Sequence, residues 1–155
     1  MSQSPREMIR LALEVASSGS GKDLPVGAII CDASGSILAS SRNAVIEKRQ
    51  TTAHAELQAI ARVDLRALKR DAQHMTIAVT LEPCPMCAWA IRAAGIGTLI
   101  FGAFNTNYGA AGSVYDLLRD KRHGRSVEVT GGVLADECQE LLVGAFLDLR
   151  NNSLG

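Results

Sequence analysis

Cys84 and Cys87 carry the side chains with the clearest capacity for chemistry, and they lie three positions apart in TLEPCPMCA. A Cys-x-x-Cys pair by itself fits a redox centre, half of a structural zinc site or part of a catalytic metal site. His54, thirty positions before Cys84 in TAHAE, supplies a third metal-binding side chain. One imidazole and two thiolates leave the fourth tetrahedral position of a zinc ion open to water, whereas a structural site normally fills all four with protein ligands. The pattern therefore favours a catalytic zinc ion.

Glu56 is the candidate acid–base group of such a site because it lies two residues after His54. Two thiolates cancel the charge of the metal, so bound water should ionise less readily than at a three-histidine site, where its pKa is about 7. A nearby base would compensate, and a carboxylate that is not a ligand is free to move protons. Cys84 and Cys87, at i and i+3 near a predicted helix start, can face the same ion, and the helix N-terminus favours their thiolate forms.

Other interpretations explain fewer of these residues. A redox pair at CPMC accounts for neither His54 nor Glu56. A c-type haem site needs a histidine directly after the second cysteine, and residue 88 is alanine. The GSGK sequence at 19–22 lacks the first glycine of a phosphate-binding loop and is followed by Asp23, so we expect an ordinary loop there.

The composition indicates one globular domain over residues 1–155. Sixteen basic and sixteen acidic residues cancel, so any contact with nucleic acid would have to be local. The chain has no apolar run of about 18 residues, and its first residues mix charges among apolar positions, so we expect a cytoplasmic protein with no membrane association. Without an export signal, disulfides are disfavoured, and Cys31 and Cys138 are predicted to be small buried side chains.

Helical and strand patterns alternate along the chain. Ser4 to Glu7 forms a capping-box pattern with proline at the first helical position, and apolar residues at helical spacing follow it. The predicted helices run from Pro5 to near residue 17, over 53–70 with a break near Asp64, over 86–94 and over 135–150; the predicted strands are 26–31, 37–40, 75–80 and 98–104, and the segments 113–120 and 126–131 complete the pattern. This alternation predicts an α/β sandwich with helices on both faces of a mixed or parallel sheet.

With these motifs in hand, the chain resembles the cytidine deaminase-like superfamily and, within it, the bacterial tRNA-specific adenosine deaminases. TAHAE and TLEPCPMCA match the metal motifs of the superfamily, while GAAGS and GVLADEC favour the tRNA enzymes. DLPVGAII and VEVTGGVLADECQELL extend the match over nearly the whole chain. The resemblance implies a three-layer α/β/α sandwich with a five-stranded mixed sheet, one zinc ion per chain and a homodimer. It also implies a hydrolase of C–N bonds that converts adenosine to inosine at the wobble position of a tRNA anticodon loop.

The resemblance also assigns roles to individual residues. It implies zinc ligation by His54, Cys84 and Cys87 and proton transfer by Glu56, in agreement with the chemistry of these side chains. Asn43 is implied as a contact to the base, and an amide has the donor and the acceptor that a base edge requires. The backbone N–H after Pro83 could bind the product carbonyl. The further implied substrate contacts lie before, between and after the metal motifs and are Pro25, Val26, Ala55, Glu82 and Asn105.

The chain departs from the tRNA enzymes at positions where they carry charge. The tRNA enzymes typically have an Arg-Asp pair and a lysine after FGA, whereas residues 104–108 here are uncharged. From Gly131 onward, four acidic residues stand against Arg150 alone. Because lysine and arginine contacts to phosphate supply much of the affinity for nucleic acid, these changes concern RNA binding and not the zinc chemistry. The basic side chains that remain are clustered at Arg119, Lys121, Arg122 and Arg125 and at Arg42, Lys48 and Arg49.

Two alternative functions therefore stay open at this point. A deaminase of a free base or nucleoside, such as guanine or cytosine, would use the same four residues, and an uncharged 104–108 segment suits it. A non-catalytic, zinc-stabilised RNA-binding module would lose stability on chelation but show no turnover, and the presence of Glu56 argues against it.

Overall fold

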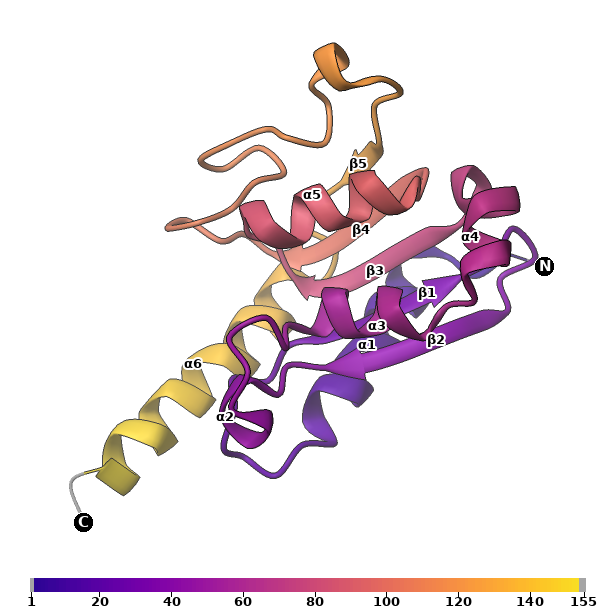
Figure 1. Cartoon of the computed structure of the whole chain (residues 1–155). Coiled ribbons are helices and arrows are strands. Elements are labelled where there is room, and N and C mark those ends of the chain that lie inside the picture. Colours follow the sequence, from indigo (N-terminus) through magenta and orange to yellow (C-terminus); the bar gives the residue numbers. More distant parts are fainter. Residues whose placement is uncertain (1, 154–155) are drawn as a thin grey trace.

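A mixed five-stranded sheet forms the centre of the computed structural model, which describes residues 2–153 (Figure 1). The strands, in the spatial order β2-β1-β3-β4-β5, are β1 (Gly27–Cys31), β2 (Ile37–Arg42), β3 (Thr76–Leu81), β4 (Thr98–Ala103) and β5 (Glu128–Thr130). β1 runs antiparallel to β2 and β3, whereas β3, β4 and β5 are parallel to one another. The predicted five-stranded mixed sheet is confirmed.

Helices cover both faces of this sheet, as the three-layer prediction requires. α3 (Ala55–Arg62) and α5 (Pro85–Ala94) pack together on one face, while α1 (Pro5–Ser17) and α6 (Ala135–Ser153) lie on the other (Figure 1). The shorter elements are α2 (Val45–Lys48), α4 (Leu65–Asp71) and the 3-10 turns η1 (Ala72–His74) and η2 (Lys121–His123).

The parallel pair β3 and β4 determines where the chemistry lies. The carboxyl ends of parallel strands meet at one edge of a sheet, which is where α/β proteins bind their ligands. β3 ends immediately before Glu82 and leads through Pro83 into α5, and β4 ends immediately before residues 104–113, a segment without helix or strand that we call the cavity loop. The cysteine motif and the cavity loop are therefore neighbours at this edge.

Local sequence signals explain the first helix and its contact with the sheet. The Ser4 hydroxyl accepts a hydrogen bond from the Glu7 backbone N–H, and the Glu7 carboxylate accepts one from the Ser4 N–H, so the predicted capping box is confirmed. Gly27 lets α1 approach β1 closely, because a Cβ at this position would lie 2.1 Å from the carbonyl oxygen of Ala12. Only glycine permits that separation.

The predicted break near Asp64 is confirmed, whereas the 113–120 and 126–131 segments differ in detail from the predictions. The 53–70 pattern forms two helices, α3 and α4, which separate at Asp64, and the Asp64 carboxylate caps α4 by accepting hydrogen bonds from the N–H groups of Arg66 and Ala67. The 113–120 segment forms no helix or strand, and β5 is limited to three residues inside the 126–131 pattern.

The segment between the cavity loop and β5 has little regular structure, and the side chain of Arg92 organises it. Its guanidinium is almost fully buried and donates hydrogen bonds to the carbonyl oxygens of Leu117, at 2.6 Å, of Gly124, at 3.3 Å, and of Asp120. A single cation therefore satisfies carbonyls that a helix or strand would otherwise pair. These hydrogen bonds explain how the segment stays ordered although it lacks the regular structure that its sequence pattern suggested.

The other two cysteines are buried, as predicted, and neither belongs to the cysteine motif. Burial raises the pKa of both the Cys31 and the Cys138 thiol to about 11, so both are protonated and unreactive at neutral pH. Within residues 2–153, no helix combines the length and the apolar character that a bilayer crossing requires.

Candidate active site

The starts of two helices bring the metal-binding side chains together. His54 is the N-cap residue of α3, and Cys84 is the N-cap residue of α5, with Pro85 in the first helical turn. Because α3 and α5 pack against each other on the same face of the sheet, their N-terminal ends meet near the carboxyl end of β3. Cys87 follows one turn later, fully buried, so its thiol points inward to the same place.

The separations of the three side chains fit a tetrahedral zinc ion. The Nδ1 atom of His54 lies 3.8 Å from the Cys84 sulfur and 3.5 Å from the Cys87 sulfur. Zinc–sulfur bonds of about 2.3 Å and zinc–nitrogen bonds of about 2.0 Å at a tetrahedral angle would separate nitrogen and sulfur by about 3.5 Å. All three ligand atoms lie within 4.8 Å of one another. His54, Cys84 and Cys87 can therefore hold one zinc ion and leave one position for water.

The charges of the cluster also suit a cation. A hydrogen bond with Cys87 and, to a smaller extent, one with His54 lower the pKa of Cys84 to about 4. The same hydrogen bond, together with burial, raises the pKa of the Cys87 thiol. The hydrogen bond to Cys84 is also the main cause that raises the pKa of His54. A negative sulfur at a helix N-terminus, beside an imidazole and a second thiol, is an arrangement that attracts zinc.

Glu56 lies beside the ligands but is not one of the three clustered groups. Its side chain is 4% exposed, and burial is the main cause that raises the pKa of its carboxyl group above the ordinary value. A raised pKa brings a carboxyl group closer to neutral pH, where it can both accept and return a proton. The position and surroundings of Glu56 thus suit the proton transfer predicted for it.

A cavity of about 460 Å³ opens above these groups. His54, Glu56 and Cys84 line it together with the predicted substrate contacts Val26, Asn43, Glu82 and Asn105. Its volume is in the range of small-molecule sites, and most of its wall is apolar, as the flat faces of a base require. The structure therefore joins residues from segments that are far apart in the sequence into one site.

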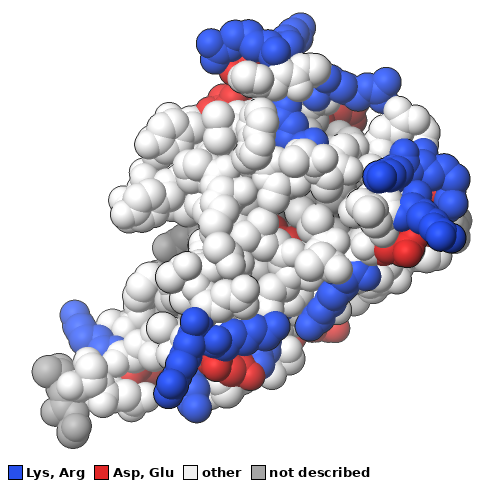
Figure 2. Space-filling model, viewed as in Figure 1, with Lys and Arg blue, Asp and Glu red and all other residues white. Residues whose placement is uncertain are grey.

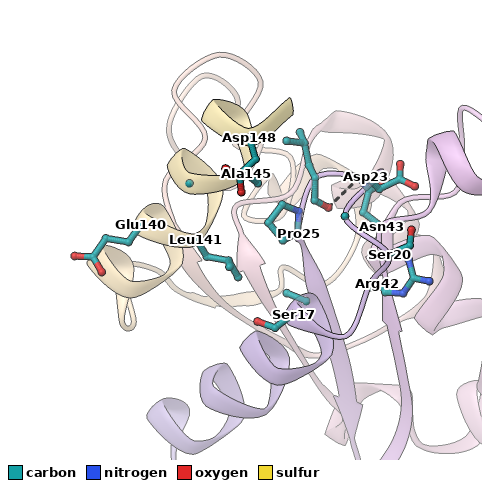
Figure 3. A pocket seen from close by; sticks show the side chains of 15 residues that line it. Ser17, Ser20, Asp23, Pro25, Arg42, Asn43, Glu140, Leu141, Ala145 and Asp148 are labelled. Atoms are coloured by element: carbon teal, nitrogen blue, oxygen red, sulfur yellow. Dashed lines mark hydrogen bonds between the residues drawn. The ribbon is translucent and has the colours of Figure 1, made fainter. Parts of the chain in front are cut away.

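The remaining predicted contacts occupy other places. Ala55 is completely buried and is not among the residues that line the cavity. Pro25 lines a second cavity of about 340 Å³, formed with residues of α1 and α6, such as Ser17 and Leu141 (Figure 3). Asn43 borders both cavities, and its side-chain N–H donates a 3.4 Å hydrogen bond to the Leu24 carbonyl oxygen.

Asn105 and Glu82 have contacts that the sequence did not reveal. The side-chain oxygen of Asn105 accepts a hydrogen bond from the Tyr108 N–H at 3.1 Å, so this side chain shapes the cavity loop while it lines the cavity. Both carboxylate oxygens of Glu82 accept hydrogen bonds from the cavity loop. The Glu82 carboxylate was predicted to contact the substrate, but its oxygen atoms accept hydrogen bonds from the protein backbone.

Several residues of the cavity wall were missed by sequence reasoning. Phe146 and Leu149 reach it from α6, Val45 and Ile46 from α2, and Tyr108 from the cavity loop. The three-residue spacing of Phe146 and Leu149 indicates one face of a helix, but no local signal shows that this face borders the cavity.

A comparison with protein families identifies the site. The family model described as the cytidine and deoxycytidylate deaminase zinc-binding region matches residues 2–103, which include Glu56 and all three candidate ligands. The chain belongs to this family. The resemblance seen in the motifs is thereby confirmed, and this deaminase is an enzyme that hydrolyses C–N bonds. Its cofactor is zinc, because the matched family region is a zinc-binding region and the three clustered side chains have the geometry of a zinc site.

Individual relatives match most of the deaminase. It is 37% identical over 146 residues to the tRNA-specific adenosine deaminase of Haemophilus influenzae, covering 94% of this chain and 84% of the relative. A solved structure from studies of A-to-I editing by tRNA:A34 deaminases has a TM-score of 0.78 and 33% identity, covering 88% of this chain and 99% of the other. The guanine deaminase of Nitrosomonas europaea has a TM-score of 0.75 at 24% identity, covering 94% and 85%, which shows a shared fold.

Proposed function

We propose that this deaminase converts adenosine to inosine at the wobble position of tRNA. The observation that carries the proposal is the match over 94% of the chain to a tRNA-specific adenosine deaminase, combined with a cavity that contains His54, Glu56 and Cys84. A base in an anticodon loop is unpaired and can be turned out into such a cavity without opening a duplex. The comparisons do not favour the alternative of a free base or nucleoside.

The side chains of the cavity divide the reaction between them. Zinc, when bound, supplies Lewis acidity that makes water a better nucleophile. The Glu56 carboxylate takes one proton from the attacking water and delivers it to the ring nitrogen. It then takes the remaining proton of the added hydroxyl and delivers it to the departing amine, so that ammonia leaves and a carbonyl remains. Val26 and Leu81 supply apolar wall against the base, and Asn43 offers its amide to the polar base edge.

Part of the basic cluster that could contact phosphate is already paired with acidic side chains. Arg119 is paired with Asp116 at 2.8 Å, and Arg122 is paired with Asp120 at 2.6 Å, so two of the four cations of the cluster near η2 already have acidic partners. Lys22 is exposed and lines the mouth of the cavity, where it can meet the backbone of a nucleotide that enters. Support for an RNA substrate therefore comes from the relatives and from Lys22, and not from a broad basic surface.

Inosine formation tests this proposal directly. We expect zinc-loaded protein to convert adenosine to inosine in an anticodon stem-loop that carries adenosine at the wobble position, measured by mass spectrometry of the nucleosides. Parallel reactions contain free adenosine, guanine, cytosine or cytidine, and we expect no product from them. Ammonia release from a free base or nucleoside, with no inosine in the stem-loop, would replace the tRNA proposal by small-molecule deamination.

We also propose that the protein is a homodimer and that it acts in the cytoplasm, where tRNA is found. Met86 and Trp89 project from α5 with 38% and 45% of their surface exposed, and exposed apolar side chains that cluster favour protein contacts. Figure 2 shows that Lys and Arg side chains lie mainly toward the edges of the molecule in this view. The area around the start of α5 is therefore largely uncharged. Light scattering should give about twice the chain mass of 16.4 kDa, and Trp89→Glu should shift it toward the monomer. A monomer mass for the unaltered protein would contradict this.

A further inference from the structure

Glu82 is a buried carboxylate for which the proton-transfer chemistry gives no use. Its side chain is 1% exposed, although it borders the cavity two residues before Cys84. A buried carboxylate is unfavourable unless hydrogen bonds compensate its charge. The partners that compensate it therefore indicate what Glu82 does.

All these partners belong to the two ends of the cavity loop. The Oε1 atom accepts hydrogen bonds from the Asn105 N–H at 3.2 Å and from the Ser113 hydroxyl. The Oε2 atom accepts hydrogen bonds from the N–H groups of Ala111 and Ser113, both at 3.1 Å. One carboxylate thus binds three backbone amides, and its two oxygens are fully engaged as acceptors.

Gly109, in the middle of the cavity loop, shows how closely the loop is folded around this carboxylate. A Cβ at position 109 would lie 2.5 Å from the Glu82 Cδ and Oε2 atoms and 2.4 Å from the Asn105 carbonyl oxygen. Any larger residue would push the loop away from Glu82. The adjacent Ala110 N–H donates a 2.8 Å hydrogen bond to the Pro83 carbonyl oxygen, so a second contact joins the loop to the same segment.

The cavity loop carries two residues of the cavity wall. Asn105 and Tyr108 line the cavity, and Asn105 is also one of the residues whose N–H is bound by Glu82. The segment that carries Glu82 continues directly into Cys84 and Cys87. Glu82 therefore connects the wall formed by the loop with the segment that carries the metal-binding cysteines.

We propose that Glu82 is a positioning residue that holds Asn105 and Tyr108 in place as the specificity wall of the cavity. The inference rests on the proposed deaminase function, though not on which base is the substrate. Glutamine at position 82 would offer one acceptor oxygen and would direct an NH₂ group at backbone N–H donors. The loop should then detach at one end, while His54, Glu56 and the cysteines keep their places.

Glu82→Gln tests the proposal when it is compared with the unaltered protein by zinc analysis, hydrogen exchange and steady-state kinetics. We expect stoichiometric zinc, faster exchange of the amides of residues 105–113, and at least a tenfold rise in KM that exceeds the fall in kcat. KM should respond more because Asn105 and Tyr108 face the substrate and not the proton-transfer group. Gly109→Ala should reproduce the pattern, while Gly144→Ala, where a Cβ meets nothing within 4 Å, should change neither exchange nor KM.

The outcomes separate this proposal from the proposed function. Loss of zinc in Glu82→Gln, unchanged loop exchange, or faster exchange with unchanged KM would each overturn the positioning role. If Glu82→Gln fails to fold, Gly109→Ala decides by the same readouts. If the unaltered protein deaminates neither the stem-loop nor any free base or nucleoside, the proposed function is wrong. In that case, the hydrogen exchange of residues 105–113 and the zinc content of Glu82→Gln still show whether Glu82 holds the loop. Unchanged exchange in a variant that retains zinc overturns the inference.

Discussion

Glu56→Ala is expected to lower the deamination rate by about 10²- to 10⁴-fold, because general acid–base catalysis contributes about that much. Zinc should remain bound, since Glu56 lies outside the three-ligand cluster. Glu56→Gln should show a similar loss while it preserves the volume of a side chain that is only 4% exposed. The measurement is the initial rate of inosine formation from the stem-loop, together with elemental analysis of the purified variant.

A matched control for Glu56 is Glu14→Gln on α1, which changes an exposed carboxylate remote from the cavity. It should keep the full rate and full zinc content. A Glu56→Ala protein that retains more than a tenth of the rate would remove Glu56 from the proton-transfer role. A variant that loses zinc along with activity would show instead that Glu56 helps to hold the metal.

Cys87→Ser is expected to abolish stoichiometric zinc binding and, with it, activity. A serine hydroxyl stays protonated where a thiolate would bind, and the fully buried position gives no room for another ligand. Metal that binds only the folded state stabilises it, by about 2.7 kcal/mol when its free concentration is a hundredfold above Kd. A chelator should therefore lower the Tm of the unaltered protein but leave the Tm of Cys87→Ser unchanged.

Cys31→Ser separates loss of metal from the cost of placing a hydroxyl in the core. Cys31 is as buried as Cys87, but it lies in β1 outside the cluster. This control should lose some stability and keep both its zinc and its response to the chelator. Stoichiometric zinc in Cys87→Ser would show that the ligand set is wrong.

The chemistry was readable from the sequence because metal sites depend on side-chain type and local spacing. Cys84 and Cys87 are three apart at the start of a helix, and His54 and Glu56 are two apart at the start of another. Such patterns determine which face of a helix carries each group. The capping box at Ser4 and the break at Asp64 were also readable, because each depends on hydrogen bonds within a few residues.

The cavity wall was less readable, because its residues come from segments that meet only in the folded chain. Glu82 followed the metal motif so closely that a substrate contact was the natural prediction, yet its carboxylate binds amides of residues 105–113. The backbone N–H groups of residues 105 and 111 have no sequence signature. Neither the depth of Glu82 nor the approach of Gly109 to it could be inferred from residue types.

The sequence by itself determined the class of chemistry and the order of the elements, since ligand types, helix starts and apolar periodicity are local properties. The tertiary structure decided which side chains close the cavity. It placed Phe146 and Leu149 of α6 at the wall and Pro25 at the neighbouring cavity. The physical reason is that a cavity wall depends on how whole elements pack on the sheet, which is a sum of many long-range contacts.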